Sequence, residues 1–229
     1  MSHHKQTLED SRSRSHLKLV GALLLLSLAV GGLYFFAFRS GSKPDLKQFG
    51  TLGEYAAEEV AKIIGRSGRV VLVYDIYDPK AGGSDAGAAF ADQGMQAAGF
   101  RKRMARLGSY SFAQDFKLAR PNMVFRSVWP AGTISKLVNA NPPETTIVLF
   151  ANPPQLSKEE KNMLQSRSGK LVVVGGALPD VQWLAKERLA HLIIASRYPV
   201  PPPPKNPESD RQMTQRVYAV VTPETVTQP

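Results

Sequence analysis

The chain lacks cysteine altogether among its 229 residues. This absence excludes disulfides, zinc–thiolate sites and cysteine nucleophiles. The sequence also has no Asn-X-Ser/Thr sequon. A domain outside the cytoplasm that has neither cysteines nor sequons fits a bacterial envelope better than a eukaryotic secretory route.

Histidine is almost as scarce in the part of the chain that we expect to fold. Of four histidines, only His191 lies beyond the first 18 residues. It stands at the start of a predicted strand, at the sheet edge opposite the expected pocket. A Ser-His-Asp arrangement is therefore not expected, and we interpret His191 as structural.

One long stretch has no charge. Residues 19–38 are uncharged and would form a helix of roughly 30 Å, the thickness of a bilayer core. The stretch ends in bulky aromatic residues, whereas a cleaved signal peptide ends at small ones. We therefore predict a retained single-pass anchor in the bacterial plasma (inner) membrane. Four basic residues before it and three after it favour a cytoplasmic N-terminus and a periplasmic domain.

The rest of the chain divides by composition. We expect these segments: a polar tail at 1–18, a linker at 39–50, an α/β domain at 51–198, and a proline-rich C-terminal tail at 199–229. The tail contains a polyproline run. It also contains a possible extra strand at 216–221, either packed back on the sheet or paired with a partner.

Within 51–198, predicted strands and helices alternate. Apolar runs rich in β-branched residues predict strands buried on both faces, and period-3.6 stripes with capping boxes predict helices. The predicted strands are 69–77, 145–151, 170–176 and 191–197. The predicted helices are 51–64, 84–98, 131–140, 158–167 and 179–189. This alternation predicts a single three-layer α/β domain with a parallel sheet and right-handed crossovers, flavodoxin-like or Rossmann-like.

The segment 99–130 is harder to interpret. The sequence AAGF at 97–100 predicts a helix stop followed by a strand, but the pattern does not fix that strand's position. The layout over 69–198 resembles flavodoxin-like folds and single lobes of periplasmic solute-binding proteins. A two-lobed binding protein closes around its ligand, and this segment has room for one lobe. The resemblance implies a fold and assigns no functional residue.

Ligands of open parallel sheets bind beyond the carboxyl ends of the strands. The sequence VVLVYDIYDPKAGGSDAG at 70–87 leads into that edge. The candidate ligand-binding residues there are Asp75, Asp78, Gly82, Gly83, Ser84, Asn152, Gly175 and Gly176. The stretch lacks the spacing of a Walker loop or a dinucleotide fingerprint, so no cofactor is expected. Three interpretations remain: an ordinary turn, a small-anion or nucleotide-like pocket, or a metal site on Asp75 and Asp78.

Basic residues concentrate at 100–126, with seven of them against Asp115 alone. We predict a partner-binding cluster at Arg101, Lys102, Arg103 and Arg106, which would face an acidic surface or another envelope protein. The aromatic residues between them are too irregular for a nucleic-acid module, so nucleic acid is not an expected partner.

The composition therefore favours a membrane-anchored, non-catalytic interaction or scaffold module. The alternatives are a domain that binds or senses a small anion or nucleotide-like ligand through the 78–85 loop, and a metal-dependent enzyme that uses Asp75 and Asp78.

Overall fold

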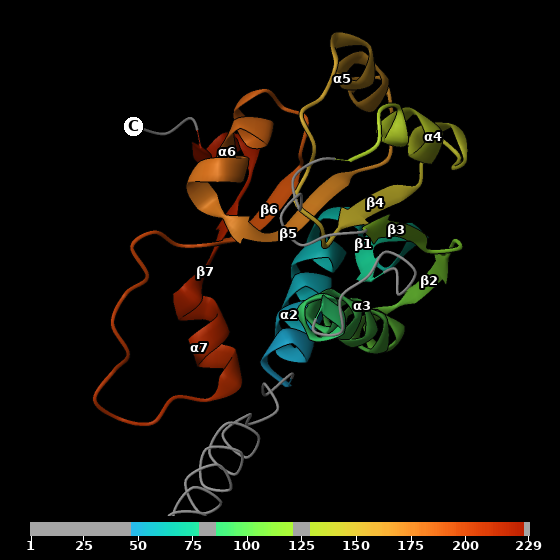
Figure 1. The fold of residues 1–229 in the computed structure, drawn as a ribbon. Helices are drawn as coiled ribbons and strands as arrows, with labels where there is room; N and C mark the ends of the chain where they lie inside the picture. The colour runs from blue at the N-terminus through green and yellow to red at the C-terminus, as the bar shows by residue number, and fades with distance from the viewer. Residues whose placement is uncertain (1–46, 78–85, 121–128, 227–229) are drawn as a thin grey trace, which may run out of the picture. The chain divides into compact units, whose positions relative to one another are not determined.

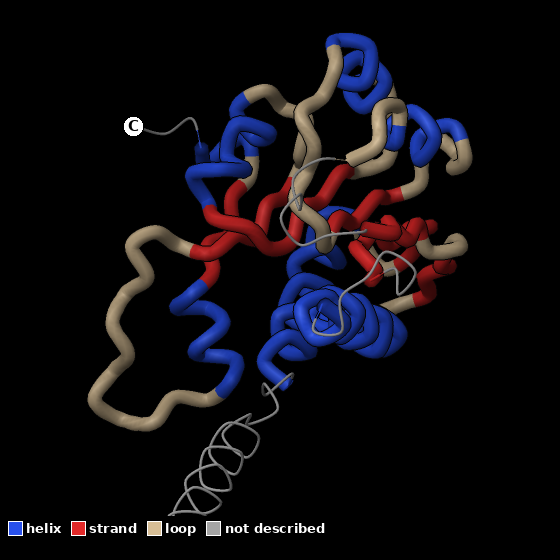
Figure 2. The backbone as a smooth tube through the Cα atoms, in the orientation of Figure 1, coloured by secondary structure: helices blue, strands red, loops and turns tan. Residues whose placement is uncertain are grey.

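A computed structural model describes residues 47–77, 86–120 and 129–226. These form a mixed sheet of mostly parallel strands between two helical layers (Figures 1 and 2). The strands are β1 (Ser67–Tyr77), β2 (Ser109–Phe112), β3 (Phe116–Arg120), β4 (Thr146–Leu149), β5 (Leu171–Ala177), β6 (Leu192–Ser196) and β7 (Tyr218–Val221). The helices are α2 (Lys47–Ile64), α3 (Ala86–Leu107), α4 (Thr133–Asn139), α5 (Lys158–Gln165), α6 (Leu178–Lys186), α7 (Asp210–Val217) and α8 (Pro223–Val226).

The sheet order is β2-β1-β4-β5-β6-β7, with β3 also paired to β1. The chain runs outward from β1 to β2 and β3, then returns past β1 to β4, so the order reverses between β1 and β4. All pairs are parallel except β6 with β7. The predicted α/β class is confirmed, and the antiparallel β7 corrects the expectation of a wholly parallel sheet.

Alternate strand residues face opposite helical layers. Val70 and Leu72 of β1 pack with α2 and α3, whereas Val71 and Val73 pack with α4, α5 and α6. All four are at most 1% exposed. Burial on both faces explains why the strands are continuous apolar runs.

Helices α2 and α3 cross at a distance that only glycine allows. A Cβ at Gly53 would lie 2.0 Å from the Gln96 carbonyl oxygen, and one at Gly99 would lie 2.3 Å from the Gly50 carbonyl oxygen. The expected helix stop at 97–100 is therefore wrong: Gly99 serves backbone packing, and α3 continues to Leu107. The expected start of the first helix at Thr51 is also wrong, since Thr51 lies inside α2 and its hydroxyl donates to the Lys47 carbonyl oxygen.

A bulge interrupts the edge strand of the sheet. Val70 pairs with Phe112 and Val73 pairs with Phe116, so two residues of β1 oppose three of the edge strand. The extra residue inverts the alternation, because Phe112 faces the α2–α3 layer and Phe116 the α4–α6 layer. This inversion is the reason that the apolar pattern of 99–130 did not fix the strand.

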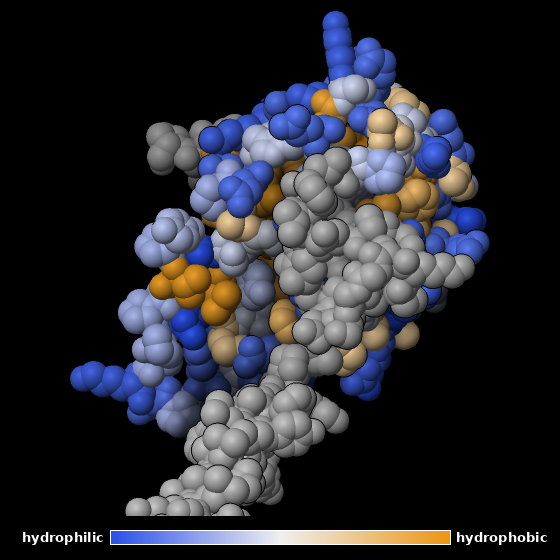
Figure 3. Space-filling view, in the orientation of Figure 1, coloured by the Kyte–Doolittle hydropathy of each residue, from blue (hydrophilic) through white to orange (hydrophobic). Residues whose placement is uncertain are grey.

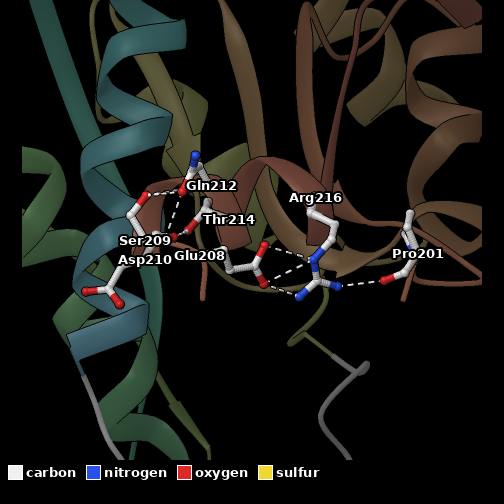
Figure 4. Close-up of polar contacts among 7 residues, drawn as sticks. All are labelled: Pro201, Glu208, Ser209, Asp210, Gln212, Thr214 and Arg216. Carbon is white, nitrogen blue, oxygen red and sulfur yellow. Dashed lines mark hydrogen bonds and ion pairs between the residues drawn. The ribbon is translucent and has the colours of Figure 1, made fainter. Parts of the chain in front are cut away.

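The C-terminal segment folds back onto the domain. After the exposed loop at 197–207, α7 begins with a capping box in which Ser209 and Gln212 exchange backbone and side-chain bonds (Figure 4). Arg216 donates to Glu208 over 3.1 Å and to the Pro201 carbonyl oxygen over 2.6 Å. These bonds hold the two ends of the proline-rich loop together. Of the two alternatives for 216–221, the structure has the strand packed back on the sheet, as β7.

Hydrophilic residues dominate the face in Figure 3, and hydrophobic ones form small separate patches. The exposed large hydrophobic side chains of the described residues are Met95, Tyr198 and Val200. No helix in the described ranges is both long and apolar enough to cross a bilayer. The anchor predicted at 19–38 lies outside the described residues, as do the 1–18 tail and most of the 39–50 linker.

The close crossing of α2 and α3 predicts that the stability of the domain is sensitive to an added methyl group at Gly53. Gly53→Ala should lower the free energy of unfolding by about 1–3 kcal/mol, because the new methyl group overlaps the α3 backbone. Gly94→Ala is the matched control: nothing lies within 4 Å of its Cβ position, and alanine there should stabilise α3 by up to about 1 kcal/mol. Urea unfolding of both variants measures the difference, and equal stability of the two would contradict the crossing.

Candidate ligand site at the carboxyl edge of the sheet

The β4–α5 loop divides the carboxyl edge of the sheet. Residues 150–157 leave β4 and reach α5, and a cavity lies on each side of them. The α4–α5 cavity has a volume of about 640 Å³ and the α5–α6 cavity about 590 Å³. Both volumes are typical of small-molecule sites, and Pro154 and Gln155 line both cavities.

The α5–α6 cavity combines an aromatic ring with polar side chains of both charges. Its lining includes Asn152, Lys161, Asp180 and Trp183. The Lys161 ammonium lies 5.5 Å from the centre of the Trp183 ring and pairs with Glu187 over 2.7 Å. Asn152 and Asp180 are exposed, so their oxygens and the Asn152 amide can hydrogen-bond a ligand.

Two of the predicted glycines lie in β5, and one of them contacts Asn152. Gly175 and Gly176 have φ of +99° and +74° at an irregularity between β5 and β6. A Cβ at Gly176 would lie 2.9 Å from Asn152 Oδ1, and the Ser196 hydroxyl donates to the Gly176 carbonyl oxygen over 3.1 Å. Gly176 therefore lies against Asn152, with Gly175 next to it in the chain, and a role of these three residues in ligand binding stays a prediction.

Asp75 lies near the end of β1, beyond the last residue of β1 that pairs with β4. Its side chain is 3% exposed, and its backbone N–H donates to Gln93 Oε1 over 2.7 Å. Position 75 alternates with Val71 and Val73 and therefore belongs to the sheet face covered by α4–α6. The other predicted loop residues, Asp78, Gly82, Gly83 and Ser84, lie outside the described residues.

Within the described ranges, no group of three His, Asp or Glu side chains could hold a metal ion. The pairing of Asp75 with Asp78 stays a prediction, because it involves an undescribed residue. The sequence reasoning missed the two tryptophans, although they were detectable: Trp129 and Trp183 are the chain's only ones, and each lines one of the two cavities.

Three of the four residues of the predicted basic cluster form ion pairs inside the domain. Lys102 pairs with Glu54 over 3.4 Å and Arg103 with Glu58 over 2.7 Å. Arg101 pairs with Asp115 and lies 4.7 Å from the centre of the Phe112 ring. Among the described residues, Arg106 has no such pair. A partner at this cluster stays a prediction.

Asp115 also orders the edge-strand bulge. The Tyr74 hydroxyl donates to Asp115 Oδ2 over 2.9 Å. Burial, followed by this bond and the charge of Asp115, raises the pKa of Tyr74 to about 12. A cavity of about 810 Å³ lies beside the bulge and is lined by Arg69, Gln114 and Lys117, all exposed. It is larger than the other two but lies at the side of the sheet, away from the strand ends where ligands bind in such folds.

Solved structures with this fold include sugar-binding proteins. An ABC transporter solute-binding protein from Burkholderia graminis, in complex with D-arabinose, matches with a TM-score of 0.51 and 14% identity over 79% of this chain and 61% of that chain. The XylFII–LytSN complex gives 0.49 and 14% over 77% and 60%. A sugar-binding protein from Bacillus halodurans gives 0.48 and 12% over 78% and 63%.

The chain thus spans about three fifths of each of these proteins. At such identities the likeness establishes the fold. No protein-family model and no curated protein matches the chain.

This comparison corrects the first functional expectation. The expectation of a non-catalytic scaffold module is contradicted, because the structure that matches with a TM-score above 0.5 is named as a solute-binding protein. The scaffold expectation rested on the basic cluster, and most of that cluster is paired within the domain. The ligand-binding alternative agrees better with the comparison.

His191 lies at the amino edge, away from both cavities. Its Nδ1 accepts from the Leu171 backbone N–H over 3.3 Å. Burial, aided by Lys170 and opposed by Glu224, lowers the pKa of His191 below its usual 6.5. The imidazole therefore stays neutral in the folded state at pH values where the unfolded chain binds a proton.

We expect His191 to make the protein less stable in acid. Its stabilising contribution is complete above the unfolded pKa, about 6.5, and is lost as pH falls through the folded pKa. Urea midpoints at neutral and mildly acidic pH should therefore differ more for the wild type than for His191→Asn, which keeps an acceptor without titrating. Replacing His3, His4 and His16 with Gln is the control and should preserve the wild-type pH dependence. Equal pH dependence in His191→Asn and the wild type would refute this assignment.

Proposed function

We propose that the domain binds a small, neutral, polyhydroxylated ligand at the carboxyl edge of its sheet, in the α5–α6 cavity. The observation that supports this most directly is the composition of that cavity. Its lining combines a half-buried aromatic ring, Trp183, with hydrogen-bonding side chains, Asn152 and Asp180. Such a cavity, mostly pre-formed and with a few polar groups that fix orientation, is typical of small-molecule sites.

The chemistry favours a sugar over an ion. Lys161 already pairs with Glu187, so its charge is partly satisfied, and Asp180 would repel an anion. Hydroxyl groups can donate to Asp180 and both donate to and accept from Asn152. The apolar face of a sugar ring could pack on Trp183. The D-arabinose bound to the matched solute-binding protein is consistent with this class.

Strand β1 ends at this edge, so the residues predicted just after it, Asp78, Gly82, Gly83 and Ser84, remain proposed contributors to the site. A periplasmic location, as predicted from the sequence, would agree with a solute-binding role. The described domain offers one wall of a site, whereas two-lobed proteins enclose their ligands. We therefore expect weak affinity, in the millimolar range, since little of the ligand's surface leaves water.

Titration of the full chain with D-arabinose and other pentoses and hexoses tests this proposal. We expect a saturable change in Trp183 fluorescence, recorded in a Trp129→Phe background. Asn152→Leu and Asp180→Ala should each weaken binding by about tenfold, because each removes a hydrogen bond to the ligand. Asn139→Leu, an exposed asparagine at the far end of α4, should leave affinity unchanged. The absence of a saturable response to any sugar up to its solubility limit would refute the proposal.

A further inference from the structure

The cavity beside the edge-strand bulge, called the bulge cavity below, is lined by two cations that are free of acidic partners. Arg69 of β1 and Lys117 of β3 line it, and both are exposed. Neither forms an ion pair within the described ranges, 47–77, 86–120 and 129–226. Three cations of α3, by contrast, are paired inside the domain. The charges of Arg69 and Lys117 are therefore available to a ligand.

The alternation of β1 places Arg69 on the sheet face where the bulge cavity lies. Position 69 alternates with Val71 and Val73, which pack against the α4–α6 layer. Helix α4 and the strands β2 and β3 lie at the same end of the sheet (Figure 1). The end of α4, at Ala140 and Asn141, forms the wall of the cavity on that face. The exposed Arg69 side chain thus extends on the side of the sheet that this wall encloses.

Asp115 is the acidic residue in the lining, and its carboxylate is already engaged. Arg101 donates to Asp115 Oδ1, and the Tyr74 hydroxyl donates to Oδ2 over 2.9 Å. Arg101 belongs to α3, and Tyr74 packs against the core that α2 and α3 cover. The Asp115 charge is therefore compensated from the α2–α3 side of the sheet. Arg69 and Lys117 leave the bulge cavity with an excess of positive charge.

The lining also has apolar and neutral polar parts. Phe116 is half-buried and packs against the core beneath α4–α6, as does Ala113. Gln114 lies between them in the bulge and is exposed, and its side chain forms no hydrogen bond with another described residue. Bulges are over-represented next to active sites, where they redirect a side chain. The cavity therefore combines a cation, an amide and an aromatic ring.

We propose that the bulge cavity binds a small organic acid, with the carboxylate on Arg69 and the apolar body against Phe116. A planar guanidinium donates two parallel hydrogen bonds to one carboxylate, and the Gln114 amide can donate another. Lys117 adds positive charge, and a cleft with charge of one sign raises the local concentration of the opposite ion. This site is independent of the proposed sugar site, because the bulge cavity shares no lining residue with the α5–α6 cavity.

Titration of the full chain with benzoate, followed by two-dimensional ¹H–¹⁵N NMR, tests this assignment. Benzamide is the control ligand, because it has nearly the same shape and no charge. We expect benzoate to shift the backbone amide resonances of Ala113, Gln114 and Ala140 in a saturable manner. Benzamide should bind at least about tenfold more weakly, because hydrogen bonds to a charged group are the stronger ones. The indole resonance of Trp183, in the proposed sugar site, should not move.

Four variants locate the site. Arg69→Gln should weaken benzoate binding about tenfold, and Arg69→Lys, which keeps the charge without the planar fork, should fall between it and the wild type. Arg66→Gln is the matched control: it removes an exposed arginine from outside the lining and should leave the affinity unchanged. Ala140→Phe adds bulk at an exposed wall position with φ of −76°, which any residue adopts, and should abolish binding without a change of charge.

Several results would overturn this inference. They are the lack of a saturable shift in the three backbone resonances up to the solubility limit of benzoate, equal affinity for benzoate and benzamide, and unchanged affinity in Arg69→Gln. Inorganic phosphate that binds as tightly as benzoate would also overturn it, since the apolar body would then contribute nothing. The sugar proposal fails separately, through the response of Trp183 to sugars.

Discussion

The backbone contact between α2 and α3 is the constraint on which the rest of the domain depends. Glycines at the crossing let the α2 and α3 backbones touch, at Gly53 against Gln96 and at Gly99 against Gly50. This closeness lets both helices cover the same sheet face with fully buried side chains, from the small Ala56 to the large Phe100. Helix α7 then docks on α2, and Glu58 pairs with both Arg103 of α3 and Arg211 of α7. A side chain at the crossing would push α2 and α3 apart.

Helices α2 and α3 cover one face of the sheet. The cavities at the strand ends lie on the other face, among α4, α5 and α6. Strand β1 is eleven residues long and β4 is four, so β1 extends beyond its neighbour and brings Asp75 toward the carboxyl edge. The order reverses between these two strands, which separates the segments that follow them. The short α4, α5 and α6 leave space above the strand ends, and both cavities occupy it. The topology thus determines where a ligand can bind, and the loops determine which ligand.

Much of this fold could be predicted from the sequence, because its strands are buried on both faces and its later helices carry local signals. The capping box of Ser157 and Glu160 is present as predicted. The failures have one common cause, which is that the residues concerned act through tertiary contacts. Gly99 looks like a helix terminator until its contact with α2 is known, and the bulge after Phe112 reverses an alternation that pattern analysis assumes to be regular. For the candidate site, topology rules point to the strand ends at Asn152, Gly175 and Gly176. They do not point to Trp129 and Trp183, which only their rarity in the chain marks out, since apolar residues near helices resemble ordinary core residues.

Charge distribution explains why composition alone suggested the wrong kind of function. A formal charge of +10 suggests a surface that binds acidic partners. The densest basic stretch, however, lies on α3, and acidic residues of α2 and of the bulge form ion pairs with it. Exposed pairs of this kind contribute little free energy, but they orient the side chains along the domain's own surface. At the carboxyl edge, by contrast, Asn152 and Asp180 are exposed and line the α5–α6 cavity beside the β4–α5 loop. Because a bound molecule needs a cavity as well as polar side chains, the lining of the sheet edge is a better guide to a binding site than net charge.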